Sequence, residues 1–231
     1  MDYTGDLITD YLRYLNQECD NLQVVQIGAM DGLSFDDIRG HLQNYRWNEV
    51  LVEPIPDLFE KLKDNLKERD NCVFENSAIT PQDGKVKMIT VSEKTIKEHD
   101  LHPGYEGMSA LYPLKNGFGT DYERDIYVKN NLAETIEVEG ITMETLISKH
   151  NIENIDIFLS DAEGHDWMIF EQLDIERFRP KFIRLEYVNL TEDEKLSVRK
   201  KLMQNDYYFE EGFDILAVDN SIYRKFTKTI E

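Results

Sequence analysis

The chain has 231 residues, of which 46 are acidic and 26 are basic, so its formal net charge is −20 at pH 7. Hydrophobic residues make up 41% of the chain and aromatic residues 11%, which excludes a disordered protein and suffices for the core of one domain. The excess of acids argues against RNA, DNA or an anionic membrane as a partner, because a polyanion binds to surfaces lined by Lys and Arg. A neutral or weakly charged small molecule or glycan fits this charge better.

Short apolar runs and two isolated cysteines narrow the class further. No apolar run is long enough to cross a bilayer, and the acidic first residues lack a signal-peptide pattern, so we expect a cytoplasmic protein. Cys19 and Cys72 lie far apart and outside any CxxC pair, which predicts buried free thiols instead of a disulfide or zinc site. The sequence does not predict the oligomeric state.

Helices and strands alternate over the first 90 residues. Apolar side chains at spacings of three and four predict an amphipathic helix over 5–19, within an N-terminal region of residues 1–20. Pro54 and Pro56 mark the start of a later helix, because proline is favoured in a first helical turn. The predicted strands are 22–27, 49–53, 72–78 and 85–90, and a further helix is predicted at 35–44.

The segment 92–135 interrupts this alternation. It is rich in Gly, Pro and aromatic residues, and a connection of this length inside a compact domain is usually functional or disordered. Its aromatic residues argue against disorder, so we predict a partly ordered insertion that covers the substrate site. His99 and His102 belong to this insertion and can reach the site, although a single histidine there is more commonly a surface residue.

The alternation resumes after the insertion and predicts one domain over residues 1–231. Strand and helix follow each other at the spacing of a parallel sheet with crossover helices. The predicted helices are 142–150, 167–173 and 192–205, the predicted strands are 155–160 and 181–188, and 207–211 with 215–219 form an antiparallel hairpin around Gly212.

Two glycines and one acid predict a nucleoside site. Gly28 and Gly32 stand in the turn after the first predicted strand, and the second predicted strand ends in Glu53. A glycine turn lets the backbone approach a ligand, and an acid about twenty residues later can accept both ribose hydroxyls. The glycine pair alone would be weak evidence, since similar spacings mark ordinary turns. An NAD site ranks low because the chain lacks GxGxxG at this turn.

Acidic residues also gather where two later strands end. Asp161 and Glu163 follow one predicted strand directly, and Glu186 lies near the carboxyl end of the next. The carboxyl ends of parallel strands meet at one edge of a sheet, so Asp161 and Glu186 are expected to face each other. Such a pair can bind a divalent cation or hold a substrate hydroxyl. The alternative for Glu186 is a hydrogen-bonded structural acid.

Two residues in this region are candidates for the base. His165 has an ordinary pKa near neutrality, which suits removal of a proton from an alcohol. Glu163 competes with it if burial raises the pKa of its carboxyl group. Asp166 is better explained as a solvated acid at a helix N-terminus, where a negative charge is favoured by the helix dipole.

Six stretches between residues 22 and 219 join these elements into one pattern. They are 27–32 (IGAMDG), 52–62 (VEPIPDLFEKL), 76–79 (NSAI), 107–111 (GMSAL), 155–164 (IDIFLSDAEG) and 180–186 (PKFIRLE). The Glu-Pro-x-Pro and Asp-x-Glu-Gly elements are the most specific of them. Together the stretches resemble the FkbM family of S-adenosylmethionine-dependent methyltransferases.

The resemblance implies an α/β, Rossmann-like class I methyltransferase fold. Its sheet would be seven-stranded and mostly parallel, with a C-terminal antiparallel hairpin and helices on both faces. The implied reaction is methyl transfer from S-adenosylmethionine to an oxygen, commonly a sugar or polyketide hydroxyl. Mg²⁺ is a less secure second cofactor.

The resemblance and the residue pattern together assign three sets of site residues. The predicted cofactor-binding residues are Gln26, Gly28, Ala29, Asp31, Gly32, Glu53, Pro54, Ser77, Ala78 and Asp161. The predicted catalytic residues are Asp161, Glu163, His165 and Glu186. The predicted metal ligands are Asp161 and Glu186.

The chain departs from the family pattern at two places. Gln26 stands where the family usually has an acid that orients the methionine end of the cofactor, and His165-Asp166-Trp167 replaces the usual continuation after Gly164. The uncharged Gln26 leaves open an alternative function, a non-catalytic cofactor-binding subunit of a glycan or natural-product pathway.

Overall fold

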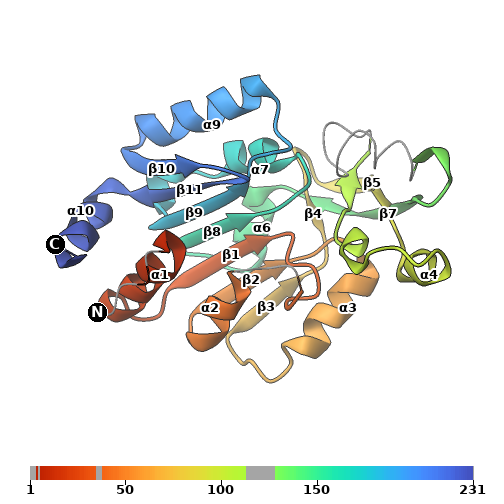
Figure 1. Cartoon of the computed structure of the whole chain (residues 1–231), viewed down its shortest axis with the longest axis horizontal. Coiled ribbons are helices and arrows are strands. Elements are labelled where there is room, and N and C mark those ends of the chain that lie inside the picture. Colours follow the sequence, from red (N-terminus) through yellow and green to blue (C-terminus); the bar gives the residue numbers. More distant parts are fainter. Residues whose placement is uncertain (1–3, 5, 35–37, 113–127, 231) are drawn as a thin grey trace.

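The computed structural model describes residues 4, 6–34, 38–112 and 128–230, and a seven-stranded sheet forms its centre (Figure 1). The strands follow the order β10-β11-β9-β8-β1-β2-β3. The pairs from β9 to β3 are parallel, whereas β11 is antiparallel to both β9 and β10. The predicted α/β fold, with a mostly parallel seven-stranded sheet and a C-terminal antiparallel hairpin, is confirmed.

Most predicted elements are present with boundaries that shift by one or two residues. The strands of the large sheet are β1 (Gln23–Ile27), β2 (Asn48–Val52), β3 (Cys72–Glu75), β8 (Ile157–Ser160), β9 (Phe182–Glu186), β10 (Tyr207–Glu211) and β11 (Asp214–Asp219). The helices around it are α1 (Leu7–Glu18), α2 (Arg39–Asn44), α3 (Pro56–Asn65), α6 (Met143–Lys149), α7 (Asp166–Gln172), α8 (Ile175–Phe178), α9 (Glu192–Gln204) and α10 (Asn220–Ile230). Residues 35–37 of the helix predicted at 35–44 lie outside the described residues.

Neighbouring side chains of the central strands pack into opposite layers of helices. In β1, Val24 packs with α1, α2 and α10, whereas Val25 packs with α6, α7 and α9. This division follows because successive side chains of a strand point to opposite faces of the sheet. The first and last helices, α1 and α10, lie side by side, and the ring centroids of Tyr11 and Phe226 are 5.3 Å apart. Both faces of the sheet are therefore covered, and its carboxyl edge is left for the site.

A second sheet of four strands lies beyond the carboxyl ends of the parallel strands (Figure 1). Its strands are β4 (Ala78–Ile79), β5 (Gly84–Thr90), β6 (Ala110–Leu111) and β7 (Glu134–Ile141), in the order β4-β7-β5-β6. The single strand predicted at 72–78 is wrong, because β3 ends at Glu75 and the chain turns at Asn76. The side chain of Asn76 donates from Nδ2 to the backbone oxygen of Glu53 (2.8 Å), and Ala78 then pairs with Gly140 in the second sheet.

The structure contains further elements that the sequence does not predict, among them β7, α8, α10 and two short helices of the insertion. These two are α4 (Glu93–Glu98) and η1 (Pro103–Glu106). Cys19 and Cys72 are free thiols as predicted, but both are partly exposed and not fully buried. Among the described residues, none of the helices has the length and apolar character needed to span a membrane.

Candidate active site

One cavity joins the carboxyl edge of the large sheet to the second sheet. It is lined by most of the predicted site residues, namely Gln26, Gly28, Ala29, Glu53, Pro54, Ser77, Ala78, Asp161, Glu163 and His165. Its wall also includes four residues of the predicted insertion, Gly104, Gly107, Ser109 and Leu111. His99 and His102 of the insertion are exposed and do not line it. The structure thus places most of the predicted cofactor residues and part of the insertion around one cavity.

Gly28 allows the ends of β1 and β8 to approach each other closely. Its φ is +78°, and a Cβ atom at this position would lie 1.9 Å from the backbone oxygen of Asp161. The backbone N–H groups of Gly28 and Ala29 both donate to the oxygen of Val52 (3.0 Å each), which joins this turn to β2. Only glycine satisfies both the positive φ and the close approach.

Asp31 and Gly32 of the same turn, also predicted to bind the cofactor, are not among the residues that line the cavity. The carboxylate of Asp31 instead accepts hydrogen bonds from the backbone N–H groups of Leu33 (2.9 Å) and Ser34 (2.7 Å). A Cβ on Gly32 would lie 2.6 Å from Leu62 of α3. Both residues therefore shape the turn and its packing on α3.

Glu53 lines the cavity and is held by two backbone donors. Its Oε2 accepts from the N–H of Met30 and its Oε1 from the N–H of Ile55, both at 2.8 Å. Burial raises the pKa of Glu53 to about 8, although these two hydrogen bonds lower it. Met30 has a φ of +50°, an uncommon conformation for a residue with a side chain, and it directs this N–H at the carboxylate. The sequence offers no sign of this role of Met30.

Gln26 belongs to a buried polar network below the glycine turn. Nη2 of Arg39 donates to Oε1 of Gln26 (2.8 Å), and Nη1 of Arg39 donates to Glu49 (2.5 Å). Arg69 donates to the other oxygen of Glu49 (2.6 Å). An amide at position 26 thus gives the buried guanidinium of Arg39 an acceptor without a further buried negative charge, whose desolvation would be costly.

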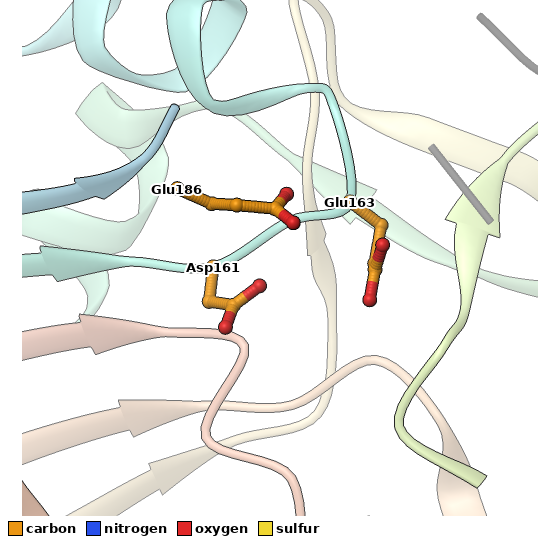
Figure 2. Close-up of side chains that lie close together, drawn as sticks. All are labelled: Asp161, Glu163 and Glu186. Carbon is orange, nitrogen blue, oxygen red and sulfur yellow. The ribbon is translucent and has the colours of Figure 1, made fainter. Parts of the chain in front are cut away.

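Three carboxylates meet beside the cavity. One oxygen from each of Asp161, Glu163 and Glu186 lies within 4.8 Å of the others, and Figure 2 shows the three side chains converging from the ends of β8 and β9. The predicted encounter of Asp161 and Glu186 is therefore confirmed. Glu186 itself lies outside the cavity wall, behind Asp161 and Glu163.

Asn189 and Gly164 hold this carboxylate cluster together. Nδ2 of Asn189 donates to Oε1 of Glu186 (2.7 Å) and to Oε2 of Glu163 (3.2 Å), and the N–H of Gly164 donates to Oε2 of Glu186 (3.1 Å). Burial, followed by the charges of Glu163 and Asp161, raises the pKa of Glu186 to about 10. Glu163 has a φ of +49°, so its backbone is strained where its side chain joins the cluster. Asn189 is a site residue that the sequence pattern does not reveal.

Asp166 is fully buried and not the solvated acid that its position predicts. Its Oδ1 accepts from the hydroxyl of Ser160 (2.5 Å) and from the N–H of Ala162 (3.2 Å). Burial and the charge of Asp161 raise its pKa to about 7. Asp166 therefore stabilises the turn that carries Asp161. His165 is also buried, and it lines the cavity next to this turn.

The donor set of the carboxylate cluster fits a hard divalent cation. Mg²⁺ takes oxygen ligands and is commonly bound through one or two carboxylates. Asp161 and Glu186, the predicted ligands, are joined by Glu163 within the same 4.8 Å. The residues present would therefore be able to hold such an ion.

The sheet order, its antiparallel hairpin and the cavity at the carboxyl edge are those of the class I methyltransferase fold. The chain belongs to the FkbM methyltransferase family, because the Methyltransferase FkbM domain matches residues 26–219. Methyltransferases of this family use S-adenosylmethionine. No curated protein matches the chain.

Several solved methyltransferase structures are similar to this chain at low sequence identity. The human methyltransferase 10 domain containing protein has a TM-score of 0.42 and 9% identity, over 95% of this chain and 85% of that one. The METTL16 methyltransferase domain has a TM-score of 0.46 and 9% identity, over 92% and 66%. Precorrin-6y C5,15-methyltransferase from Geobacter metallireducens GS-15 has a TM-score of 0.40 and 12% identity, over 94% and 88%.

Proposed function

We propose that this methyltransferase acts on a hydroxyl oxygen of a small molecule or glycan, with a sugar as the favoured acceptor. The observation that carries the proposal is the convergence of Asp161, Glu163 and Glu186 beside the cavity that contains Gly28 and Glu53. A hydroxyl group must lose its proton as it is methylated, and carboxylates can hold the group and accept that proton. The acidic wall and the net charge of −20 favour an acceptor without phosphate groups.

The proposed mechanism relies on alignment and proton removal by residues of this chain. The residues around Gly28 and Glu53 would hold S-adenosylmethionine, which would supply an activated methyl group for transfer from its sulfur to the acceptor oxygen. Asp161 holds the acceptor hydroxyl in line, Glu186 positions Glu163 through Asn189, and Glu163 or His165 takes the proton of the hydroxyl. Both candidate bases line the cavity, so the choice between them depends on where the acceptor lies.

Substitution of Glu186 tests this proposal without removing a residue of the cavity wall. In Glu186→Gln we expect methyl transfer from labelled S-adenosylmethionine to a panel of sugars and polyols to fall about 10- to 100-fold, because Asn189, which joins Glu186 to Glu163, loses one of its carboxylate partners and the cluster is misaligned. Binding of S-adenosylhomocysteine, measured by calorimetry, should change less than about threefold. The product should be a methyl ether, which is stable to alkali.

The matched control is Glu176→Gln, an exposed acid of α8 outside the cavity. This variant should retain full activity. Equal rates in Glu186→Gln and Asp161→Asn compared with the unmodified protein would contradict the proposed role of the cluster. Comparison of the variants Glu163→Gln and His165→Gln then identifies the base, because only the loss of the base changes the pH dependence of the methyl-transfer rate.

We also propose Mg²⁺ as a ligand of the carboxylate cluster, where it would lower the pKa of the acceptor hydroxyl. Treatment with a chelator should then lower methyl transfer at least about tenfold, and added Mg²⁺ should restore it. An unchanged rate after chelation would show that the carboxylates act without a metal.

In the alternative function, a cofactor-binding subunit without catalysis, the carboxylate cluster has no role. Labelled methyl transfer to cell extracts would then be absent.

A further inference from the structure

Part of the cavity wall comes from a segment of the insertion whose short helix, η1, has no fully buried residue. This segment, residues 103–111, contains η1 and places Gly104, Gly107, Ser109 and Leu111 on the cavity. The apolar support of η1 comes from Tyr105, which packs against the cluster of Ile89, Val91 and Ile96, and polar contacts of η1 add to this support.

Lys61 of α3 provides such a contact. Its Nζ lies 2.5 Å from Oε1 of Glu106 in η1 and 3.2 Å from Oε2 of Glu93, the first residue of α4. One ammonium group thus joins three elements that are 13 to 45 positions apart in the chain. Burial lowers the pKa of Lys61, but the two carboxylates outweigh it and hold the pKa above its ordinary value. The ammonium group is therefore charged and engaged with both partners.

The same part of the segment packs against the cofactor wall. A Cβ on Gly107, directly after Glu106, would lie 3.1 Å from the sulfur of Met30. Met30 in turn donates its backbone N–H to Glu53 (2.8 Å). At its other end the segment is joined to the second sheet, where Ser109 donates to the hydroxyl of Thr90 (2.8 Å). The ion pairs of Lys61 therefore act on the side of the segment that faces Met30 and Glu53.

We propose that Lys61 is a positioning residue that holds segment 103–111 over the cofactor cavity through Glu106 and Glu93. By fixing this wall, Lys61 sets how fast the cofactor and its product leave. The inference rests on the cofactor of the family and is independent of the methyl acceptor. It predicts a change in dissociation rates, whereas a residue that only stabilises α3 would change the stability of the protein alone.

The test measures the dissociation rate of S-adenosylhomocysteine from the full chain by stopped-flow displacement. Lys61→Met, which keeps the aliphatic part of the side chain, should raise this rate about three- to tenfold, as expected for the loss of two partly exposed ion pairs. The matched control is Lys63→Met on the same helix, because the ammonium group of Lys63 contacts Glu60 and the ring of Phe59, both of which belong to α3 itself. This control should leave the rate unchanged.

We call the contacts of Lys61 with Glu106 and Glu93 the clasp. Two further measurements distinguish the loss of this clasp from a general loss of stability. In the unmodified protein the rate should rise between about 0.05 M and about 0.5 M KCl, because salt screens exposed charges, whereas Lys61→Met should show no such rise. The double exchange Lys61→Glu with Glu106→Lys should restore slow dissociation that Lys61→Glu alone loses. Backbone hydrogen exchange at residues 103–111 should be fast in Lys61→Glu, and it should be slow in the unmodified protein and in the double variant.

Equal dissociation rates in Lys61→Met and Lys63→Met would overturn the proposal. So would a faster rate that the charge exchange fails to restore. Failure of the unmodified protein to bind S-adenosylhomocysteine would contradict both the cofactor and the clasp. A normal clasp in a protein that methylates none of the tested hydroxyl compounds would leave this inference standing and contradict only the proposed acceptor.

Discussion

Gly28→Ala is expected to weaken binding of S-adenosylhomocysteine strongly and to lower the free energy of unfolding by about 2 to 5 kcal/mol. Two costs add up here. The φ of +78° is unfavourable for any residue with a Cβ atom, and that atom would lie 1.9 Å from the backbone oxygen of Asp161. The backbone of β1 or β8 must therefore move. A displacement of this size at the centre of the cavity should weaken binding about 100-fold or more.

Two other glycines provide controls for Gly28→Ala. Gly84→Ala introduces a Cβ at a φ of +142° with no atom within 4 Å, so it measures backbone strain without a collision. Gly40→Ala lies in α2, also with no atom within 4 Å, and should stabilise the protein by about 0.5 to 1 kcal/mol. Urea unfolding and calorimetry measure both effects. Binding in Gly28→Ala within twofold of the unmodified protein would contradict the placement of the cofactor beside this turn.

Binding of S-adenosylhomocysteine is expected to strengthen as the pH rises from about 6 to about 8, by up to tenfold per pH unit. The cause is Glu53, whose pKa is raised to about 8 by burial. Ribose hydroxyls donate to the ionised carboxylate, so the ligand binds best to the form that has lost its proton. Above the pKa the affinity should level off. Calorimetry at a series of pH values measures this profile.

The effect of Glu53 on the unliganded protein has the opposite sign. A carboxyl whose pKa is higher in the folded than in the unfolded state binds more protons when folded. Its contribution to the free energy of unfolding is therefore complete below about pH 4 and is lost as the pH rises through about 8. The ligand and the proton thus compete at Glu53.

Glu53→Gln should flatten the pH profile and weaken binding about 100-fold at pH values above about 8. The amide has only one oxygen, so its NH₂ group would face the backbone N–H of either Met30 or Ile55, both of which now donate to the carboxylate. Urea unfolding of the variant shows whether the fold is kept. Glu68→Gln, an exposed acid just after α3, is the control and should retain the profile of the unmodified protein. A profile independent of pH in the unmodified protein would contradict the assignment of Glu53.

Local patterns in the sequence predict the large sheet well. Each of its strands follows a helix or a turn whose signals lie within a few residues, such as Pro56 in the first turn of α3 and Thr191 in the capping box of α9. The second sheet is different. β4 has only two residues, and it forms because Ala78 pairs with Gly140, 62 positions later. No local pattern encodes such a pairing.

The site divides in the same way. The spacing of Gly28 and Glu53 and the acids at the ends of two strands are properties of the sequence, because the topology of a parallel sheet brings strand ends together. The hydrogen-bond donors that hold these groups in place cannot be recognised from the sequence. Asn189 joins Glu163 to Glu186, and Met30 reaches Glu53 through an unusual backbone conformation.

The sequence by itself thus determined the family, the main sheet and the chemical groups of the site. The tertiary structure alone decided which of these groups touch, and it buried Asp166, for which a solvated position was expected, beneath the turn that carries Asp161. The physical reason is that periodicity and turn residues act over one or two helical turns or strands. Contacts such as those of Lys61 with Glu93 and Glu106 depend instead on how separate elements pack.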